Sequence, residues 1–476
     1  MNNKKNILLI ICDQLSAQAL KCYGNTYVDA PNIDRLAREG VVFDNAYTSC
    51  PLCQPARASF WTSRYPHQTH VLSNVKDMGF DKLSGEIPTL GEVFTQNGWR
   101  CVHFGKEHDY GALRGFEVVK SVEIKKEPEY PSWTYAYESH FDEDTTQKVV
   151  NFIDSKPELP YLAVADLHNP HNICMWIGEN QGEHQDIPIP PHVELPPLLD
   201  NFEFEDIANR PEFIQFMCCA HRRQRHTVGW TRENYKHYLA AYYYYIHLVD
   251  KKIGAILDSL ERQNQLEDTL IMLFADHGEG MGAHGLVTKY GTFYEETNRV
   301  PMIVRGPGVL PRAANVDGLV SVLDVMPTLL DYAGIHVPEA VEVEGISLIK
   351  ELSGKSQTVS TEYVVSEWYD EFEGYRIPGR MVRGKDYKYM CYNDVQGEEL
   401  YDMKADRGET RNLIHDAQYS EVLEKYRGML KEHVEKTNDN FYELKAEYDE
   451  RYRKHDLGFK HHTGLSAVED YALRGK

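Results

Sequence analysis

The sequence predicts an α/β fold built on a mainly parallel β-sheet with helices on its faces. The main observation is a set of four short apolar runs, each followed directly by polar residues: Ile7–Cys12, Arg100–Phe104, Tyr161–Leu167 and Leu270–Ala275. Runs of this length, separated by segments with helical periodicity, are typical of buried parallel strands. The chain has 476 residues, of which 42% are hydrophobic and 26% charged, so it can bury a sizeable core.

Two segments between these runs differ in character. From about residue 234 to 260, apolar residues recur every three or four positions, which predicts an amphipathic helix with Tyr238, Tyr242 and Tyr245 in the core. Residues 174–230 instead contain a cluster of prolines that breaks any regular element. We expect this segment to be an insertion that serves as a lid or binding loop.

Toward the carboxyl terminus the predicted elements become shorter. Residues 381–392 have the pattern of a hairpin, and one amphipathic helix is expected at 421–435. We therefore expect a main domain at residues 1–355, a small α+β domain at 356–445 and a charged tail at 446–476.

Composition excludes several classes of protein. Lysine and arginine number 51 and aspartate and glutamate 73, and the net charge of −22 opposes generic binding to nucleic acids or anionic membranes. The first apolar run is too short for a signal peptide, and no stretch approaches the roughly 18 apolar residues of a membrane helix. We expect a cytoplasmic protein. Nine scattered cysteines do not form a recognisable disulfide framework.

The polar clusters that follow the four apolar runs are the first candidates for a functional site. Ligands of parallel sheets bind beyond the carboxyl ends of the strands, so these clusters are expected to converge on one edge. They are Asp13-Gln14, Lys106-Glu107-His108, His168-Asn169 and Asp276-His277.

The segment Ser49–Arg64 carries two overlapping motifs. Cys50 and Cys53 form a C-x-x-C pair, which is compatible with a redox pair or half of a zinc site, although no second half with zinc spacing is present. Cys53 also begins a C-x-P-x-R element that ends at Arg57. At this element the chain resembles the type I sulfatases, in which the motif's cysteine is oxidised after translation to formylglycine.

The resemblance extends over nearly the whole chain. Segments similar to those of sulfatases follow in family order: NILLIICDQ, PNIDRLAREGVVFDNAY, CQPAR, GKEH, DLHNPH, FADHGEGMGAHG, KYGTFYEETNRVPMIVRGPG and ELYDMKADRGETRNL. This resemblance implies an alkaline-phosphatase-like α/β fold with a smaller carboxyl-terminal α+β domain. It also implies hydrolysis of a sulfate ester at a single divalent metal.

The metal ligands that the resemblance implies are Asp13, Gln14, Asp276 and His277, together with the modified Cys53. Most of these donors are oxygen atoms, which suit a hard cation; we expect Ca²⁺, with Mg²⁺ and Mn²⁺ as alternatives. Gln14 stands where the family often has a second acid, and this lowers the negative charge of the site. An Asp-Gln pair also occurs in choline-sulfatase-like and phosphonate-monoesterase-like relatives.

The nucleophile implied by the resemblance is the hydrate of formylglycine at Cys53. One hydroxyl attacks sulfur, and the second then collapses the hemiacetal and expels sulfate. Arg57, one helical turn later, is expected to fix the diol.

The other catalytic positions implied by the resemblance are Lys106, His108, His168 and Lys289. Lys106 is expected to bind sulfate, and His108 to orient the diol or remove a proton. His168 and Lys289 are expected to contact sulfate, one of them as general acid to the leaving oxygen. Glu107 stands where the family usually has tryptophan, which changes the charge beside His108.

The function that follows is hydrolysis of an organic sulfate monoester, with a small sulfated carbohydrate as the first expectation for the substrate. A sulfatase-maturing enzyme is the implied partner, and an oligomer is compatible with the sequence. The alternatives are a phosphonate monoester or phosphodiester hydrolase, a choline-sulfatase-like enzyme, and a non-catalytic metal or redox protein that uses Cys50 and Cys53. The basic segment 221–226 is open to a role in steering an anionic substrate or in a solvated or subunit-contact face.

Overall fold

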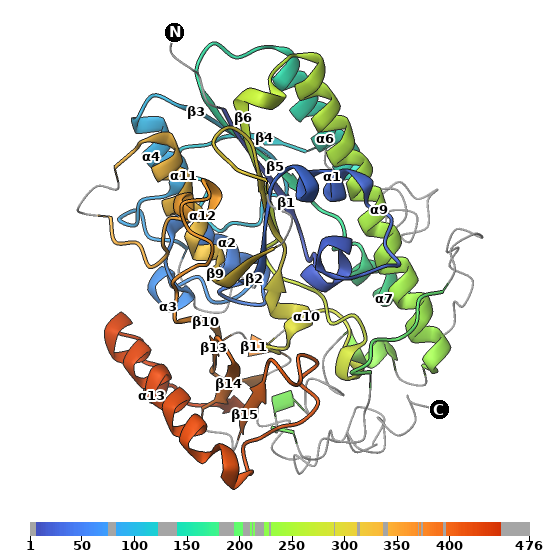
Figure 1. Ribbon diagram of the computed structural model, residues 1–476, viewed down its shortest axis with the longest axis vertical. Helices are drawn as coiled ribbons and strands as arrows, with labels where there is room; N and C mark the ends of the chain where they lie inside the picture. The colour runs from blue at the N-terminus through green and yellow to red at the C-terminus, as the bar shows by residue number, and fades with distance from the viewer. Residues whose placement is uncertain are drawn as a thin grey trace.

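The computed structural model describes residues 6–74, 82–121, 140–179, 195–202, 210–211, 213–214, 223–227, 230–289, 291–311, 315–336, 341–369, 371–372, 375–393 and 397–448. Its centre is a nine-stranded sheet in the order β4-β3-β5-β1-β6-β8-β2-β7, with β9 paired to β2 (Figure 1). The strands are β1 (Asn6–Cys12), β2 (Val41–Tyr47), β3 (Arg100–Gly105), β4 (Glu117–Lys120), β5 (Tyr161–Leu167), β6 (Thr269–Phe274), β7 (Arg299–Val300), β8 (Met302–Arg305) and β9 (Val316–Ser321).

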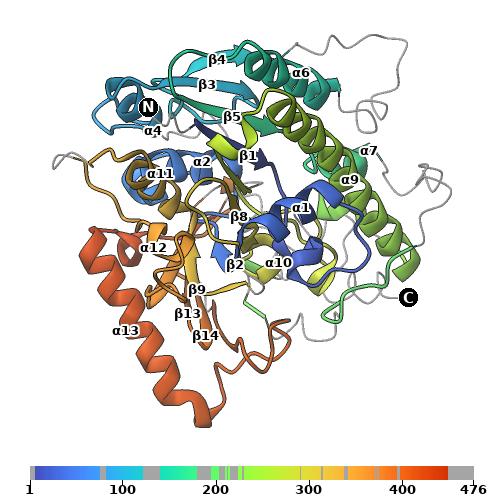
Figure 2. The ribbon, with the colours of Figure 1, turned by 45° about the horizontal axis from the view of Figure 1, so that its top comes forward.

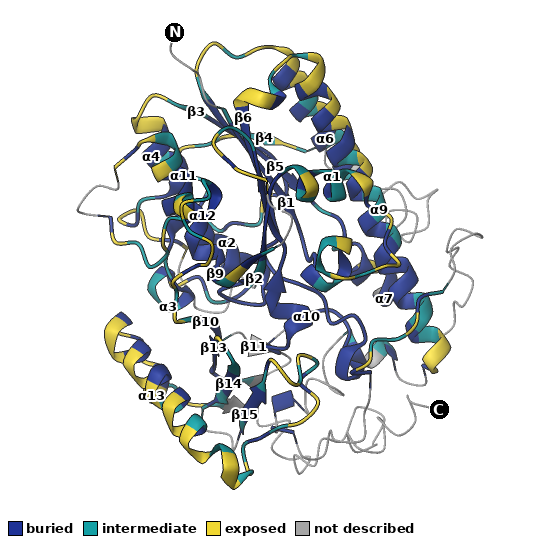
Figure 3. Ribbon diagram, in the orientation of Figure 1, coloured by how far each residue is buried: buried dark blue, intermediate teal, exposed yellow. Residues whose placement is uncertain are grey.

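The four predicted apolar runs form four neighbouring strands, β3, β5, β1 and β6. All of them are parallel, and in β1 Ile7 lies opposite Leu162 on one side and Leu270 on the other. Helices cover both faces of this part of the sheet, so nearly every residue of these strands is buried, which explains why the runs are mainly apolar (Figure 3). The carboxyl ends of the four strands therefore lie side by side.

The helices divide between the two faces of the sheet (Figures 1 and 2). One face carries α1 (Pro31–Glu39), α6 (His140–Asp154), α7 (Ile173–Glu179) and α9 (Arg232–Arg262). The other carries α2 (Cys53–Thr62), α4 (Leu90–Gln96), α11 (Val325–Ala333) and α12 (Ile349–Leu352). Two short helices, α3 (Pro66–Thr69) and α10 (Glu295–Asn298), lie near the carboxyl-terminal strands.

Helix α9 confirms the amphipathic helix predicted from residue 234 to 260. It begins after Thr231, whose hydroxyl accepts a hydrogen bond from the Asn234 N–H and so caps the first turn. Tyr238, Tyr242 and Tyr245 are fully buried, as predicted. The hydroxyls of Tyr238 and Tyr242, however, also reach the polar residues at the strand ends.

The carboxyl-terminal part forms a second, antiparallel sheet in the order β10-β13-β14-β15, with α13 (Ser420–Thr437) packed on it. Its strands are β10 (Tyr363–Trp368), β13 (Gly379–Gly384), β14 (Tyr387–Tyr392) and β15 (Gly397–Asp402), and β13 with β14 is the predicted hairpin. A small third sheet contains β11 (Glu371–Phe372), β12 (Tyr375–Arg376) and β16 (Glu447–Tyr448). Figure 3 shows α13 buried on its inner side and exposed on its outer side. The predicted fold class, α/β with a smaller α+β part, is confirmed.

Buried ion pairs join this second sheet to the main one. Lys388 of β14 is fully buried, with its Nζ 3.1 Å from Glu295 of α10 and 2.8 Å from Glu409. His67 of α3 is paired with Glu367 of β10 at 2.7 Å. In the described part of the chain, no helix has both the length and the apolar character needed to cross a membrane. Much of the predicted insertion, including residues 180–194, and the tail from residue 449 onward lie outside the described residues.

Candidate active site

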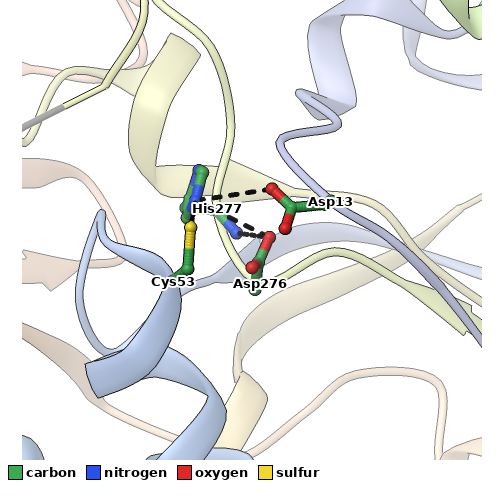
Figure 4. A group of neighbouring side chains, drawn as sticks. All are labelled: Asp13, Cys53, Asp276 and His277. Atoms are coloured by element: carbon green, nitrogen blue, oxygen red, sulfur yellow. Dashed lines mark hydrogen bonds and ion pairs between the residues drawn. The ribbon is translucent and has the colours of Figure 1, made fainter. Parts of the chain in front are cut away.

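Four buried side chains from three segments of the chain converge at the carboxyl edge of the main sheet. Asp13 follows β1, Cys53 begins α2, and Asp276 and His277 lie just beyond β6. Their ligand atoms all lie within 4.8 Å of one another, and Figure 4 shows the side chains turned toward a common centre. The prediction that the strand-end clusters meet is therefore confirmed for these residues.

The backbone around Asp276 fixes the orientation of this group. Asp276 Oδ1 accepts hydrogen bonds from the N–H groups of Gln14 at 3.1 Å and His277 at 3.0 Å. The Nδ1 atom of His277 lies 2.9 Å from the Gly278 carbonyl, so this nitrogen is the donor and Nε2 is left to face Cys53 Sγ at 3.1 Å. The imidazole is thus held in the tautomer that a metal ligand requires.

The chemistry of these donors fits a divalent cation. Asp13 and Asp276 are fully buried, and Asp13 Oδ1 has no hydrogen-bond partner within the described part of the chain. A buried carboxylate oxygen is costly unless a donor or a cation satisfies it. The arrangement of two carboxylates, one imidazole and one amide, with position 53 beside them, provides mostly oxygen ligands for such a cation.

Gln14 is held beside this group by contacts with both ends of its amide. Its Oε1 accepts a hydrogen bond from Lys289 Nζ at 2.7 Å, and its Nε2 donates to Glu279 Oε2. Its backbone carbonyl accepts from the Tyr242 hydroxyl at 2.8 Å. Glu279 was not anticipated from the sequence, because only the folded chain brings it against Gln14.

Lys106 and Lys289 place positive charge next to the cysteine. Their Nζ atoms lie 3.9 Å and 3.3 Å from Cys53 Sγ, and Lys106 also pairs with Asp13. Burial acts to raise the pKa of Cys53, but Lys106, Lys289 and His277 outweigh it and hold that pKa well below its usual value. An anion at position 53 is therefore strongly stabilised.

The backbone before Lys106 is shaped by a glycine. Gly105, the last residue of β3, has a φ of 106°, and a Cβ at this position would collide with the Asp166 carbonyl. The Lys106 N–H then donates to that same carbonyl at 3.1 Å. This close approach turns the lysine out of the sheet toward Asp13.

Arg57 lies one turn along α2 and is fully buried among acidic groups. Its guanidinium donates to Asp276 Oδ2 at 3.0 Å and to Asp166, and lies 3.3 Å from Asp13 and 3.8 Å from Asp109. These carboxylates raise the pKa of Arg57 although burial opposes them. Arg57 is therefore firmly bound to two of the predicted metal ligands.

Three histidines line the same edge. His108 and His171 both lie close enough to Cys53 to affect ionisation at this site, and the ring of His168, the residue selected from the sequence, lies 4.8 Å from that of His171. Burial lowers the pKa of His168 to about 4 and that of His171 well below its usual value. The motif DLHNPH contains both histidines, so the sequence indicated the segment but not which ring contacts Cys53.

The remaining candidates lie away from this group. Cys50 packs in the apolar cluster with Tyr47 and Leu52. His284 Nδ1 lies 3.1 Å from Arg210 Nη2, and the His284 ring packs against the ring of Tyr294. In the basic segment, the described Gln224 donates to the Gly285 carbonyl at 2.7 Å, and residues 221 and 222 lie outside the described part.

Comparison with known proteins agrees with this site. The family model "Sulfatase" matches residues 5–335, and the model "N-sulphoglucosamine sulphohydrolase, C-terminal" matches residues 282–437. The chain is 43% identical over 469 residues to the Delta 4,5-hexuronate-2-O-sulfatase of Bacteroides thetaiotaomicron, covering 98% of this chain and 96% of that protein. It is 29% identical to the choline-sulfatase of Rhizobium meliloti, covering 87% and 83% of the two chains.

The fold comparison gives the same result. The solved structure of a 2-O GAG sulfatase superposes with a TM-score of 0.89 at 43% identity, covering 98% of this chain and 99% of that one. The family match spans well over half of the chain and includes the strand-end residues described above. The chain therefore belongs to the sulfatase family, and it is a sulfuric ester hydrolase.

Proposed function

We propose that this protein removes the 2-O-sulfate from a hexuronate at the end of a small glycosaminoglycan fragment, with Cys53 converted to formylglycine. The main structural support for this reaction is the environment of Cys53 at the start of α2. Its Sγ lies close to Lys106, Lys289 and His277. The substrate class is supported by the 43% identity to a hexuronate-2-O-sulfatase over nearly the full chain.

In the proposed reaction, Cys53 Sγ stands in for an oxygen of hydrated formylglycine. Asp13, Gln14, Asp276 and His277 would hold one divalent cation, with Ca²⁺ favoured by the oxygen donors. Such a cation supplies positive charge that lowers the pKa of an oxygen nucleophile and balances the charge of the sulfuryl group. The proposal requires a sulfatase-maturing enzyme, because conversion of a cysteine to an aldehyde needs an oxidant that amino-acid side chains do not supply.

The cationic side chains are placed to bind the sulfuryl oxygens. Lys106 and Lys289 both approach Cys53 Sγ, and their fixed ammonium groups stabilise the negative charge that spreads over sulfate in the transition state. His108 and His171 lie beside the nucleophile position, and we assign them its orientation. We assign delivery of the proton to the leaving oxygen to Lys289 or His168.

Two measurements test this proposal. The mass of the tryptic peptide Glu39–Arg57, from protein made with a maturing enzyme, should show an aldehyde at position 53. An unmodified thiol beside a matured control sulfatase would overturn the mechanism.

The proposed substrate class is tested by comparing hydrolysis rates of several candidate substrates at equal concentration. We expect kcat/KM for an unsaturated 2-O-sulfated disaccharide to exceed that for the isomer sulfated on the hexosamine, choline sulfate and phenyl phosphonate by at least about tenfold. A faster reaction with choline sulfate would favour the choline-sulfatase alternative. The 29% identity to a choline-sulfatase is the reason for including this substrate. A faster reaction with phenyl phosphonate than with the sulfated disaccharide would identify the protein as a phosphonate monoester hydrolase.

A further inference from the structure

Gln14 contributes an amide, and an amide has two chemically opposite ends. Its oxygen can bind a cation, whereas its NH₂ group carries hydrogens and repels one. The two ends have almost the same shape, so packing alone does not select between them. Something beside Gln14 must determine which end faces the centre of the site.

Glu279 supplies that selection on one side of the amide. Its carboxylate Oε2 accepts a hydrogen bond from Gln14 Nε2, and its Oε1 accepts from the Tyr238 hydroxyl and the Thr288 N–H. These partners all donate, so the carboxylate can receive only the NH₂ end of Gln14. Gln14, Glu279 and Tyr238 are all fully buried, so the contact is shielded from bulk solvent.

Lys289 makes the same selection from the other side. An ammonium group can only donate, and its Nζ lies 2.7 Å from Gln14 Oε1 and 3.3 Å from Cys53 Sγ. The oxygen of Gln14 is therefore on the side of Cys53, and the NH₂ group is on the side of α9, where Tyr238 lies.

We propose that Glu279 is a positioning residue that holds the amide of Gln14 so that Oε1, and not Nε2, serves the metal group. This inference rests on the metal site of the proposed function. It also accounts for the glutamine in place of a second acid, since a carboxylate at position 14 would lie against Glu279 with no hydrogen between the two.

The first test is calorimetric Ca²⁺ binding to chelator-stripped protein, with position 53 in the same form throughout. Glu279→Gln keeps the shape of the side chain but can present its own NH₂ to Gln14, which favours turning the amide over. We expect affinity to fall about 10- to 100-fold, as for other residues that orient metal ligands. Glu399→Gln is the control: this buried glutamate of β15 accepts hydrogen bonds from the Tyr294 and Tyr401 hydroxyls, away from the metal group, and the change should leave affinity unchanged.

The decisive test exchanges the two residues. Gln14→Glu alone should weaken Ca²⁺ binding despite its added charge. The double variant, Gln14→Glu with Glu279→Gln, should bind Ca²⁺ at least about tenfold more tightly than Gln14→Glu alone, because the hydrogen-bond donor and acceptor are then exchanged. A role limited to holding the fold predicts that the double variant is worse than either single one. That result, or equal affinity of Glu279→Gln and wild type, would overturn the inference. If wild type itself binds no divalent cation, the metal site of the proposed function fails instead.

Discussion

The ion pair between His67 and Glu367 allows the dependence of stability on pH to be worked out. The His67 ring lies 2.7 Å from Glu367 and links α3 to β10 of the second sheet. Burial acts to lower the pKa of His67, but the charge and hydrogen bond of Glu367 outweigh it and raise this pKa from 6.5 to about 9. Burial likewise opposes the shift of Glu367, whose pKa Arg380 and His67 hold at about 2.

The sign follows from the direction of the histidine shift. The folded protein binds the proton of His67 more tightly than the unfolded chain, so the stabilisation is fully present below pH 6.5 and is lost as the pH rises through 9. The difference between 9 and 6.5, at about 1.4 kcal/mol for each pKa unit, amounts to about 3 to 4 kcal/mol.

Urea unfolding of wild type and His67→Asn near pH 6 and near pH 10 tests this reasoning. We expect the variant to be less stable by about 3 to 4 kcal/mol at the lower pH, and the gap to shrink by most of that amount at the higher pH. His70→Asn is the matched control, because His70 is exposed and its left-handed backbone, with φ of 58°, accepts asparagine. A gap that stays constant or widens with pH would refute the argument.

Three further predictions concern the active site. Cys53→Ala should abolish sulfate release while circular dichroism stays native; near-normal release would exclude Cys53 as nucleophile. Asp276→Ala should lose both activity and calorimetric Ca²⁺ binding, and excess metal should not restore them, whereas chelator-treated wild type should recover on adding Ca²⁺; full activity of the stripped wild type would contradict the site. If Lys289 is the general acid, Lys289→Ala should slow alkyl sulfates far more than 4-nitrophenyl sulfate, whose leaving group needs no proton; equal losses would point to sulfate binding alone.

The sequence predicted the strands that are buried on both faces. β1, β3, β5 and β6 are mostly apolar because helices cover both faces of the sheet there, and the two polar residues inside them, His103 of β3 and Asp166 of β5, are buried against each other. β2 and β8 were not predicted, since charged residues interrupt or end them: Asp44 lies inside β2 and pairs with Arg299, and Arg305 ends β8 and pairs with Glu267. The charged residues of these strands form ion pairs with residues distant in the sequence, and a local sequence pattern does not reveal such partners.

The candidate site divides in a similar way. Asp13, Lys106 and Asp276 follow apolar runs, and the rule for parallel sheets was enough to bring them together. His171 and Glu279 depend on how a loop turns after a strand, and a one-dimensional pattern does not distinguish them from their neighbours. The structure places both beside residues that the motifs had selected.

Arg57 shows why the role of a motif residue needs the fold as well as the motif. The resemblance implies a contact with the diol at position 53, and in the structure the guanidinium hydrogen-bonds to Asp276, Asp166 and Asp13. Removing a fully buried charge from such a network leaves carboxylates uncompensated, at a cost of about 3–5 kcal/mol for a single broken pair. We therefore expect loss of activity on substituting Arg57 to reflect displacement of Asp13 and Asp276 and a weakened core. We propose that the arginine of the motif supports the reaction by holding Asp13 and Asp276 in place beside position 53.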